Sequence, residues 1–238
     1  MAGLYNLFGM ILKWVYGVVS GLGAEPKSIS YFAMTLMAMS ILSKLISIPL
    51  TYKSTQQMKK TQELQPKLEA LKKKYGYDER ILQQKTMEFY KENNASAAGC
   101  SSCLPIIIQF VIVIALFGVI REPAKYLFAT EAEFNAISRN FFWISDLSNP
   151  DPFWFALPLI NGLSQIAIMK LNPTTAQTGQ SGAAGSMKMM MYITPIMIFI
   201  MGMKWASALL LYWGFGNVIE IIMRLIMMLF GKKKVVEE

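Results

Sequence analysis

Long runs of apolar residues recur along this chain and alternate with shorter polar segments. A helix needs about 17–25 mostly apolar residues to cross a bilayer core of about 30 Å. The pattern therefore predicts an all-α polytopic membrane protein with five spans. These are residues 29–52, 103–121, 153–170, 188–203 and 205–230.

The polar segments differ in character. Residues 53–102 are strongly charged and predict a helical hairpin followed by a loop. Residues 122–152 form a loop on the other side of the membrane, with Asp146 and Asp151 in an exposed turn. Residues 171–187 are a low-complexity Gly/Ser/Thr/Gln loop, and residues 231–238 are a short basic tail.

The hairpin has clear local signals. The break "YGYD" (75–78) ends its first helix, and Asp78 is placed to cap a second helix that runs to about Asn93. Pro66 lies within the first helix and is expected to start or kink it. The apolar face of that first helix comprises Leu64, Leu68, Leu71 and Tyr75.

The N-terminal residues 1–28 allow two interpretations. Residues 1–23 are apolar but contain Lys13, and no basic region precedes them, so they make a poor cleavable signal. They form either a sixth span or a helix in the outer interface, with Trp14 and Tyr16 at headgroup level. Five spans favour the interfacial helix followed by a linker.

Composition narrows the chemistry. The chain has no His, and its two cysteines form one CxxC at Cys100 and Cys103, which supplies only two of the four ligands of a structural zinc site. Catalytic zinc and Ser-His-Asp chemistry are hard to build without His. We therefore expect no metal, no cofactor and no enzymatic activity. An enzyme that uses Asp146, Asp151 or Glu220 stays a weaker alternative.

Charge sets the expected orientation. Residues 53–96 hold ten Lys/Arg against six Asp/Glu. Together with 171–187 and the C-terminus, and counting Lys170, Lys188 and Arg224 at span ends, they would place 16 of the 23 basic residues on one side. Basic loops face the cytoplasm, so the N-terminus is expected outside. The hairpin is either simply solvated or a basic surface for anionic lipid or ribosomal RNA. Its candidate contacts are Lys59, Lys60, Lys72, Lys73 and Lys74.

Lys44 stands inside an otherwise uncharged apolar run, where a charge costs about 2.5–3.5 kcal/mol on insertion scales. Ser40, Ser43, Ser47 and Thr51 fall with it in an arc of about 100° of the helix. Snorkelling to the cytoplasmic edge and a polar cavity explain Lys44 equally well. The serines favour a hydrated, positively charged pocket in the inner half of the membrane.

Other spans also carry polar residues at helical spacing. Each of them either hydrogen-bonds a neighbouring helix or lines the same pocket. Glu220 and Arg224 are an i, i+4 pair in the favoured order. The set comprises Gln109, Asn161, Ser164, Gln165, Tyr192, Thr194, Trp213, Asn217, Glu220 and Arg224.

Four stretches follow one another in a specific order and spacing. They are "SKLISIPLTYK" opening 43–76, "GCSSCLPIIIQF" closing 88–110, "DPFWFALPLINGLSQ" (151–165) and "KWASALLLYWGFGN" closing 193–217. Over residues 29–230 the chain resembles the YidC/Oxa/Alb family of membrane protein insertases, in its short bacterial form without a large external domain.

The resemblance implies a function for Lys44. In this family a basic residue, usually arginine, stands five positions before the proline of a "PL" pair, which here is Pro49–Leu50. That residue lines a hydrophilic groove open to the cytoplasm and to lipid. The family implies an insertase that uses no nucleotide, with the third and fifth helices as the surface along which the substrate helix leaves.

The chain departs from the family pattern at several positions. Lysine replaces the usual arginine at Lys44 and loses bidentate recognition of carboxylates. Cys103 matches the common cysteine, so the CxxC is incidental. "KWASALLLYW" lacks the Pro and Gly frequent before the last helix. Met223 and Arg224 stand where glutamines are common, which puts the groove contacts of the last helix in question.

The resemblance implies nascent membrane proteins and membrane lipids as partners in a bacterial plasma membrane, and no DNA. The ribosome and a Sec translocon are candidate partners. Because the tail is short, ribosome contact would rest on the hairpin. A small channel or transporter is the alternative, for which polar stripes should run through to both sides.

Overall fold

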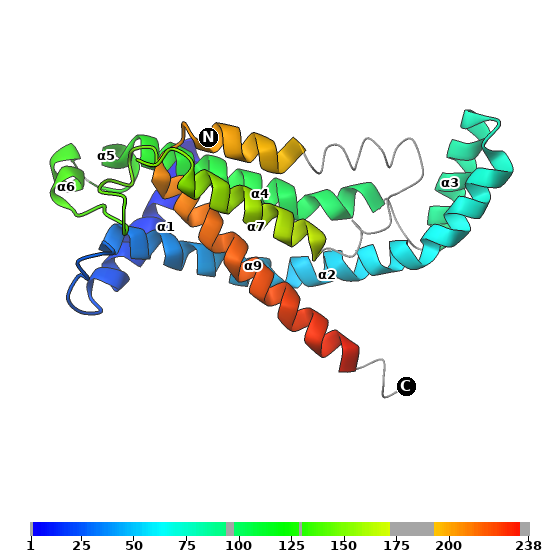
Figure 1. The fold of residues 1–238 in the computed structure, drawn as a ribbon, viewed down its shortest axis with the longest axis horizontal. Coiled ribbons are helices and arrows are strands. Elements are labelled where there is room, and N and C mark those ends of the chain that lie inside the picture. Colours follow the sequence, from blue (N-terminus) through cyan, green and yellow to red (C-terminus); the bar gives the residue numbers. More distant parts are fainter. Residues whose placement is uncertain (1, 94–97, 129, 172–192, 234–238) are drawn as a thin grey trace.

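The computed structural model describes residues 2–93, 98–128, 130–171 and 193–233, and within these the fold is helical without a strand. The predicted all-α class is therefore confirmed for this part of the chain (Figure 1). The helices are α1 (Ala2–Ser20), α2 (Tyr31–Tyr75), α3 (Glu79–Glu92), α4 (Ala98–Arg121), α5 (Pro123–Tyr126), α6 (Glu131–Ala136), α7 (Ala156–Lys170), the helix Ile193–Gly202 and α9 (Ser207–Lys233).

Within the described residues, three helices are long and apolar enough to cross a membrane. They are α1, the Tyr31–Lys53 part of α2 and the Ser207–Met228 part of α9. The span predicted at 103–121 lies within the 24-residue α4, whose side chains are described from Ile108 onward. The spans predicted at 153–170 and 188–203 fall on the shorter helices α7 and Ile193–Gly202. Three long apolar helices fit a polytopic membrane protein, and the number of five spans stays a prediction.

Helix α1 satisfies the length and composition of a span, although the sequence favoured an interfacial helix. It packs against α2 and α4 and buries Leu12, Val15 and Val19. At Gly9 the backbones approach so closely that a Cβ would lie 2.0 Å from the Tyr126 carbonyl oxygen. The helix is thus built into the bundle along one face, whichever way it lies relative to the bilayer.

Helices α2 and α9 form the centre of the bundle. Helix α9 packs on α2 and on α7, and α2 also contacts α1, α4 and α3. Figure 1 shows α4, α7 and α9 gathered along the first part of α2, while the rest of α2 runs on to α3. The fully buried core includes Phe32, Leu36, Leu116, Leu209 and Leu210.

The first predicted span and the first hairpin helix are one continuous helix. Helix α2 runs through Pro49 and Pro66, so Pro66 does not start a helix. The break and cap that the sequence predicted are confirmed, because the Asp78 carboxylate accepts hydrogen bonds from the Arg80 and Ile81 amides and α3 then ends at Glu92. Figure 1 shows α3 folded back on α2, away from the other helices.

The loop before α7 makes hydrogen bonds to the N-terminal ends of two helices, α2 and α9. Asn149 and Leu147 carbonyls accept hydrogen bonds from the first amides of α9, and the Asn140 carbonyl accepts from both the amide and the hydroxyl of Ser30, the N-cap of α2. The helices α2 and α9 are thereby fixed at the same end of the bundle.

The predicted exposed turn at Asp146 and Asp151 is wrong for Asp151, which is only 4% exposed. Its carboxylate accepts hydrogen bonds from the Trp143 indole and from the Phe153 and Leu157 amides. Three donors compensate its burial, because a carboxylate left without them would not remain inside. Asp151 therefore holds the first turn of α7 through the Leu157 amide.

Candidate functional site

The serines of α2 lie against α9. Ser40 is fully buried and donates to the Leu36 and Tyr212 carbonyls at 3.0 and 2.7 Å. Ser43 contacts the Tyr212 hydroxyl at 3.0 Å and donates to the Ser40 carbonyl, and Ser47 donates to the Ser43 carbonyl. Ser40 and Ser43 thus make helix–helix contacts, the more modest of the two roles that the sequence allowed.

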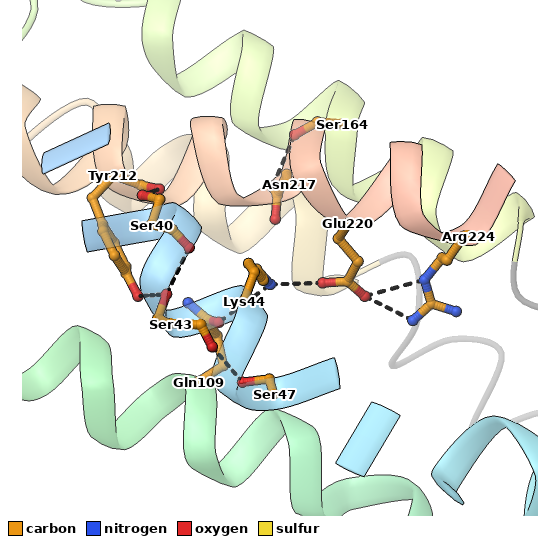
Figure 2. A network of polar contacts seen from close by, with 10 residues as sticks. All are labelled: Ser40, Ser43, Lys44, Ser47, Gln109, Ser164, Tyr212, Asn217, Glu220 and Arg224. Atoms are coloured by element: carbon orange, nitrogen blue, oxygen red, sulfur yellow. Dashed lines mark hydrogen bonds and ion pairs between the residues drawn. The ribbon is translucent and has the colours of Figure 1, made fainter. Parts of the chain in front are cut away.

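Lys44 projects from the same face of α2 into an ionic cluster. Its Nζ lies 2.7 Å from Glu220 Oε2 on α9 and 3.5 Å from Gln109 Oε1 on α4. The other Glu220 oxygen accepts two hydrogen bonds from Arg224, at 2.7 Å from Nη2 and 3.1 Å from Nε. Figure 2 shows the three charged side chains in a row between α2 and α9.

We call Lys44, Glu220 and Arg224 the charged triad. Their side chains are 13%, 20% and 14% exposed, so the triad is largely withdrawn from solvent. Two cations and one carboxylate leave it with a net charge of +1. The positive sign agrees with the pocket that the sequence predicted, but the lysine already has a counterion.

The backbone of α9 makes room for the lysine stem. A Cβ at Gly216 would lie 3.3 Å from Lys44 Cε, which is tighter than most real contacts. Gly216 therefore lets Lys44 run close along α9 to reach Glu220 one turn further on. No local pattern indicates this role of Gly216, because the contact joins residues far apart in the chain.

A second polar group joins α7 to α9. Asn217 donates to the Ser164 hydroxyl at 2.9 Å, and Asn161 donates to the Leu157 and Leu210 carbonyls at 2.9 and 3.0 Å. Asn161 Oδ1 is buried, and among the described residues no hydrogen-bond donor reaches it. The hydrogen bonds to Leu210 and from Asn217 fasten α7 and α9 to each other.

The remaining predicted residues are more scattered. Trp213 is buried and stacks on Trp205 with ring centroids 6.3 Å apart. Gln165, Thr194 and Thr51 are partly buried. Tyr192 lies outside the described residues.

The hairpin lysines form a mixed surface. Lys73 and Lys74 are exposed and Lys72 is partly buried, whereas the side chains of Lys59 and Lys60 lie outside the description. On α3 a hydrogen bond from Lys85 to Glu88 raises the pKa of that lysine and pairs its charge. Contact of this surface with lipid or RNA stays a prediction.

The most direct contact of the site, between Lys44 and Glu220, was not predicted from the sequence. The sequence grouped Lys44 and Glu220 on polar faces and identified the Glu220–Arg224 spacing, but it offered no pairing across 176 residues. Within the described residues no group of three His, Cys, Asp or Glu side chains could hold a metal ion. The side chains of Cys100 and Cys103 lie outside that description.

Comparison with known proteins shows which family this chain belongs to. The family model described as 60Kd inner membrane protein matches residues 25–234. A Fusobacterium nucleatum protein named Membrane protein insertase YidC is 34% identical over 234 residues, which are 97% of this chain and 100% of that protein.

Two further relatives carry the same name. The Clostridium perfringens protein is 33% identical over 98% of this chain and 93% of its own length. The Leptospira interrogans protein is 33% identical over 82% of this chain, but this match covers only 30% of that longer protein. The match covers nearly the whole length of the short relatives, and the long apolar helices agree with it. The chain is a member of the 60Kd inner membrane protein family, the YidC/Oxa family of membrane proteins.

Proposed function

We propose that this protein is a membrane protein insertase that moves polar segments of nascent membrane proteins across the bacterial inner membrane. Family membership supports this, because relatives of nearly the same length are named insertases. The structural observation that carries the mechanism is the charged triad, which sits between two helices that are both apolar enough to span the bilayer.

The physical problem is the cost of moving a polar segment through hydrocarbon. A single charge at the centre of a helix costs about 2.5–3.5 kcal/mol on insertion scales and more in other estimates. A polar groove in the inner half of the bilayer would shorten the dry path. With a net charge of +1, the triad would attract an acidic or polar segment of the substrate.

The proposed groove combines the α2 and α9 polar residues with those of α4, α7 and the helix Ile193–Gly202. Lys44 would lie on the cytoplasmic half, since it follows Tyr31 by about 20 Å along α2 at 1.5 Å per residue. We place the hairpin and C-terminus in the cytoplasm and the N-terminus outside, as the distribution of basic residues favours.

The helices of the triad also offer a path into lipid. On α9 the side chains of Val218, Ile222 and Leu225 are exposed on the face of the helix opposite Glu220, and on the neighbouring α7 Leu159 and Leu163 are exposed. Apolar surface of this kind would accept the apolar helix of a substrate once its polar segment has crossed. Burial of that helix in lipid would then drive the reaction.

The test is rescue of cells depleted of their own insertase, combined with insertion assays on substrates that have acidic or neutral translocated tails. Lys44→Arg should retain insertion, and Lys44→Gln and Lys44→Ala should lose it for acidic tails first. Lys125→Gln, which removes an exposed lysine paired with Glu122, is the matched control.

Failure of the unmodified protein to rescue such cells would overturn the insertase assignment. Equal insertion of acidic tails by Lys44→Gln and the unmodified protein would overturn electrostatic capture alone. Ion flux through proteoliposomes that contain the protein would instead support the channel alternative.

A further inference from the structure

The proposed function assigns Lys44 to the binding of an acidic group of the substrate. In the structure, however, Lys44 is already paired with Glu220, a carboxylate of the same chain. Glu220 Oε2 lies 2.7 Å from Lys44 Nζ, a short distance for a charge-assisted hydrogen bond. A substrate carboxylate therefore cannot simply add to a free cation. It has to replace Glu220.

The second half of the triad makes that replacement possible. Removing one partner of a buried ion pair is normally costly because the other charge is left without compensation. Glu220, however, holds Arg224 through its other oxygen, with two hydrogen bonds of 2.7 and 3.1 Å. When Lys44 moves to a substrate, Glu220 keeps a full counterion.

The helical geometry favours the same order of events. Arg224 is four residues after Glu220 on the same helix, so this pair stays together whatever α2 does. Lys44 comes from a different helix on a long flexible stem and has Gln109 Oε1 as a further neighbour at 3.5 Å. The bond between helices is thus the one that can open, and the bond within α9 is the one that persists.

We infer that Glu220 and Arg224 control access to Lys44 by counterion exchange. A substrate carboxylate replaces Glu220 at Lys44 Nζ, while Glu220 keeps its ion pair with Arg224. This inference rests on the proposed insertase function and deepens it. The triad then selects segments that carry an acidic residue, because a neutral segment cannot replace the carboxylate. Return of Glu220 to Lys44 then releases the substrate. A lysine without such a counterion, withdrawn from water, would keep the substrate carboxylate bound.

The exchange is tested by photocrosslinking of a nascent substrate to the full-length protein in membranes. The probe is placed at Ile48, an exposed residue one turn beyond Lys44 on α2. The two substrates are identical single-span proteins whose translocated tail carries either one Asp or one Asn. The measured quantity is the ratio of acidic to neutral crosslinking.

The exchange predicts opposite effects at the two residues. Arg224→Gln leaves Glu220 dependent on Lys44, so the ratio should fall about tenfold. Glu220→Gln removes the competitor, so the ratio should rise by a similar factor. In the double variant Arg224→Gln should add less than about twofold, because Arg224 acts only through Glu220.

A simple effect of net charge gives a different result. Arg224→Gln would then lower the ratio by the same factor whether or not Glu220 is present, and that additivity would overturn the inference. A loss of packing would reduce crosslinking of both substrates equally, which would also overturn it. Melting in detergent verifies that each variant is folded. If Glu220→Gln does not fold, Glu220→Asp, whose shorter reach weakens the bond to Lys44, should raise the ratio in its place.

The proposed function is judged separately by the unmodified protein. If it supports insertion but the double variant shows additivity, the exchange alone fails. If it supports no insertion of either substrate, the insertase assignment fails.

Discussion

The charged triad predicts that Glu220 matters more for stability than Lys44, although Lys44 is the proposed contact with the substrate. Lys44→Met removes one hydrogen bond to a charged group, which contributes about 1.5–3 kcal/mol. Glu220 keeps Arg224, and a buried cation no longer has to be desolvated, so we expect a net loss of about 1 kcal/mol.

Glu220→Met has a larger expected effect. It removes all three hydrogen bonds of the carboxylate and leaves two cations, 13% and 14% exposed, side by side without a counterion. Removing one member of such a buried group costs about 3–5 kcal/mol. Because both cations have flexible stems that can reach toward water, we expect the lower end, about 3 kcal/mol.

The difference of about 2 kcal/mol is measurable by thermal unfolding in detergent. For a chain of this size it corresponds to about 4–8 °C in Tm between the two variants. Lys125→Met is the control, since Lys125 is 64% exposed and its pair with Glu122 should contribute less than about 1 kcal/mol. Equal destabilisation by Lys44→Met and Glu220→Met would refute the reasoning, because it would mean that Arg224 does not hold Glu220.

Four further substitutions test the packing and the loops by the same thermal unfolding. Gly9→Ala places a Cβ 2.0 Å from the Tyr126 carbonyl oxygen and should lower the free energy of unfolding by about 1–3 kcal/mol or more. Gly17→Ala meets nothing within 4 Å and should stabilise α1 by about 0.5–1 kcal/mol. Similar effects of the two substitutions would contradict the docking of α1. Asp151→Asn cannot accept from all three donors and should cost about 1–3 kcal/mol, and no loss would contradict its burial. Phe142 has φ of +46° and is exposed, so Phe142→Asn should raise stability by about 0.5–1 kcal/mol, and a fall would show that the ring makes contacts that outweigh the strain.

Much of the local structure follows from short-range sequence signals. Asp78 caps α3 because its carboxylate reaches amides two and three residues ahead. The apolar repeat on the hairpin part of α2 is equally local, and Leu64, Leu68 and Leu71 are all partly buried while Lys67 and Glu69 are exposed. Such features need no knowledge of the rest of the fold.

Other features were not visible in the sequence. The length and polarity of the loop before α7 indicated exposure, but the Trp143 indole and two amides surround Asp151 and make its burial favourable. The continuity of α2 through two prolines also contradicts the ordinary effect of proline within a helix. Packing against neighbouring helices can offset such local preferences, which a linear pattern does not show.

The sequence by itself determined an all-helical, basic membrane protein with a family resemblance and with a lysine on a serine-rich face of one helix. These properties depend on composition and on periods of three to four residues, which a chain carries without folding. Only the tertiary structure decided that this lysine meets Glu220, because the two residues are 176 positions apart in the chain and their contact depends on how α9 packs on α2. The charge of Lys44 is therefore paired with a carboxylate of the same chain, and the proposed exchange with a substrate depends on this pairing.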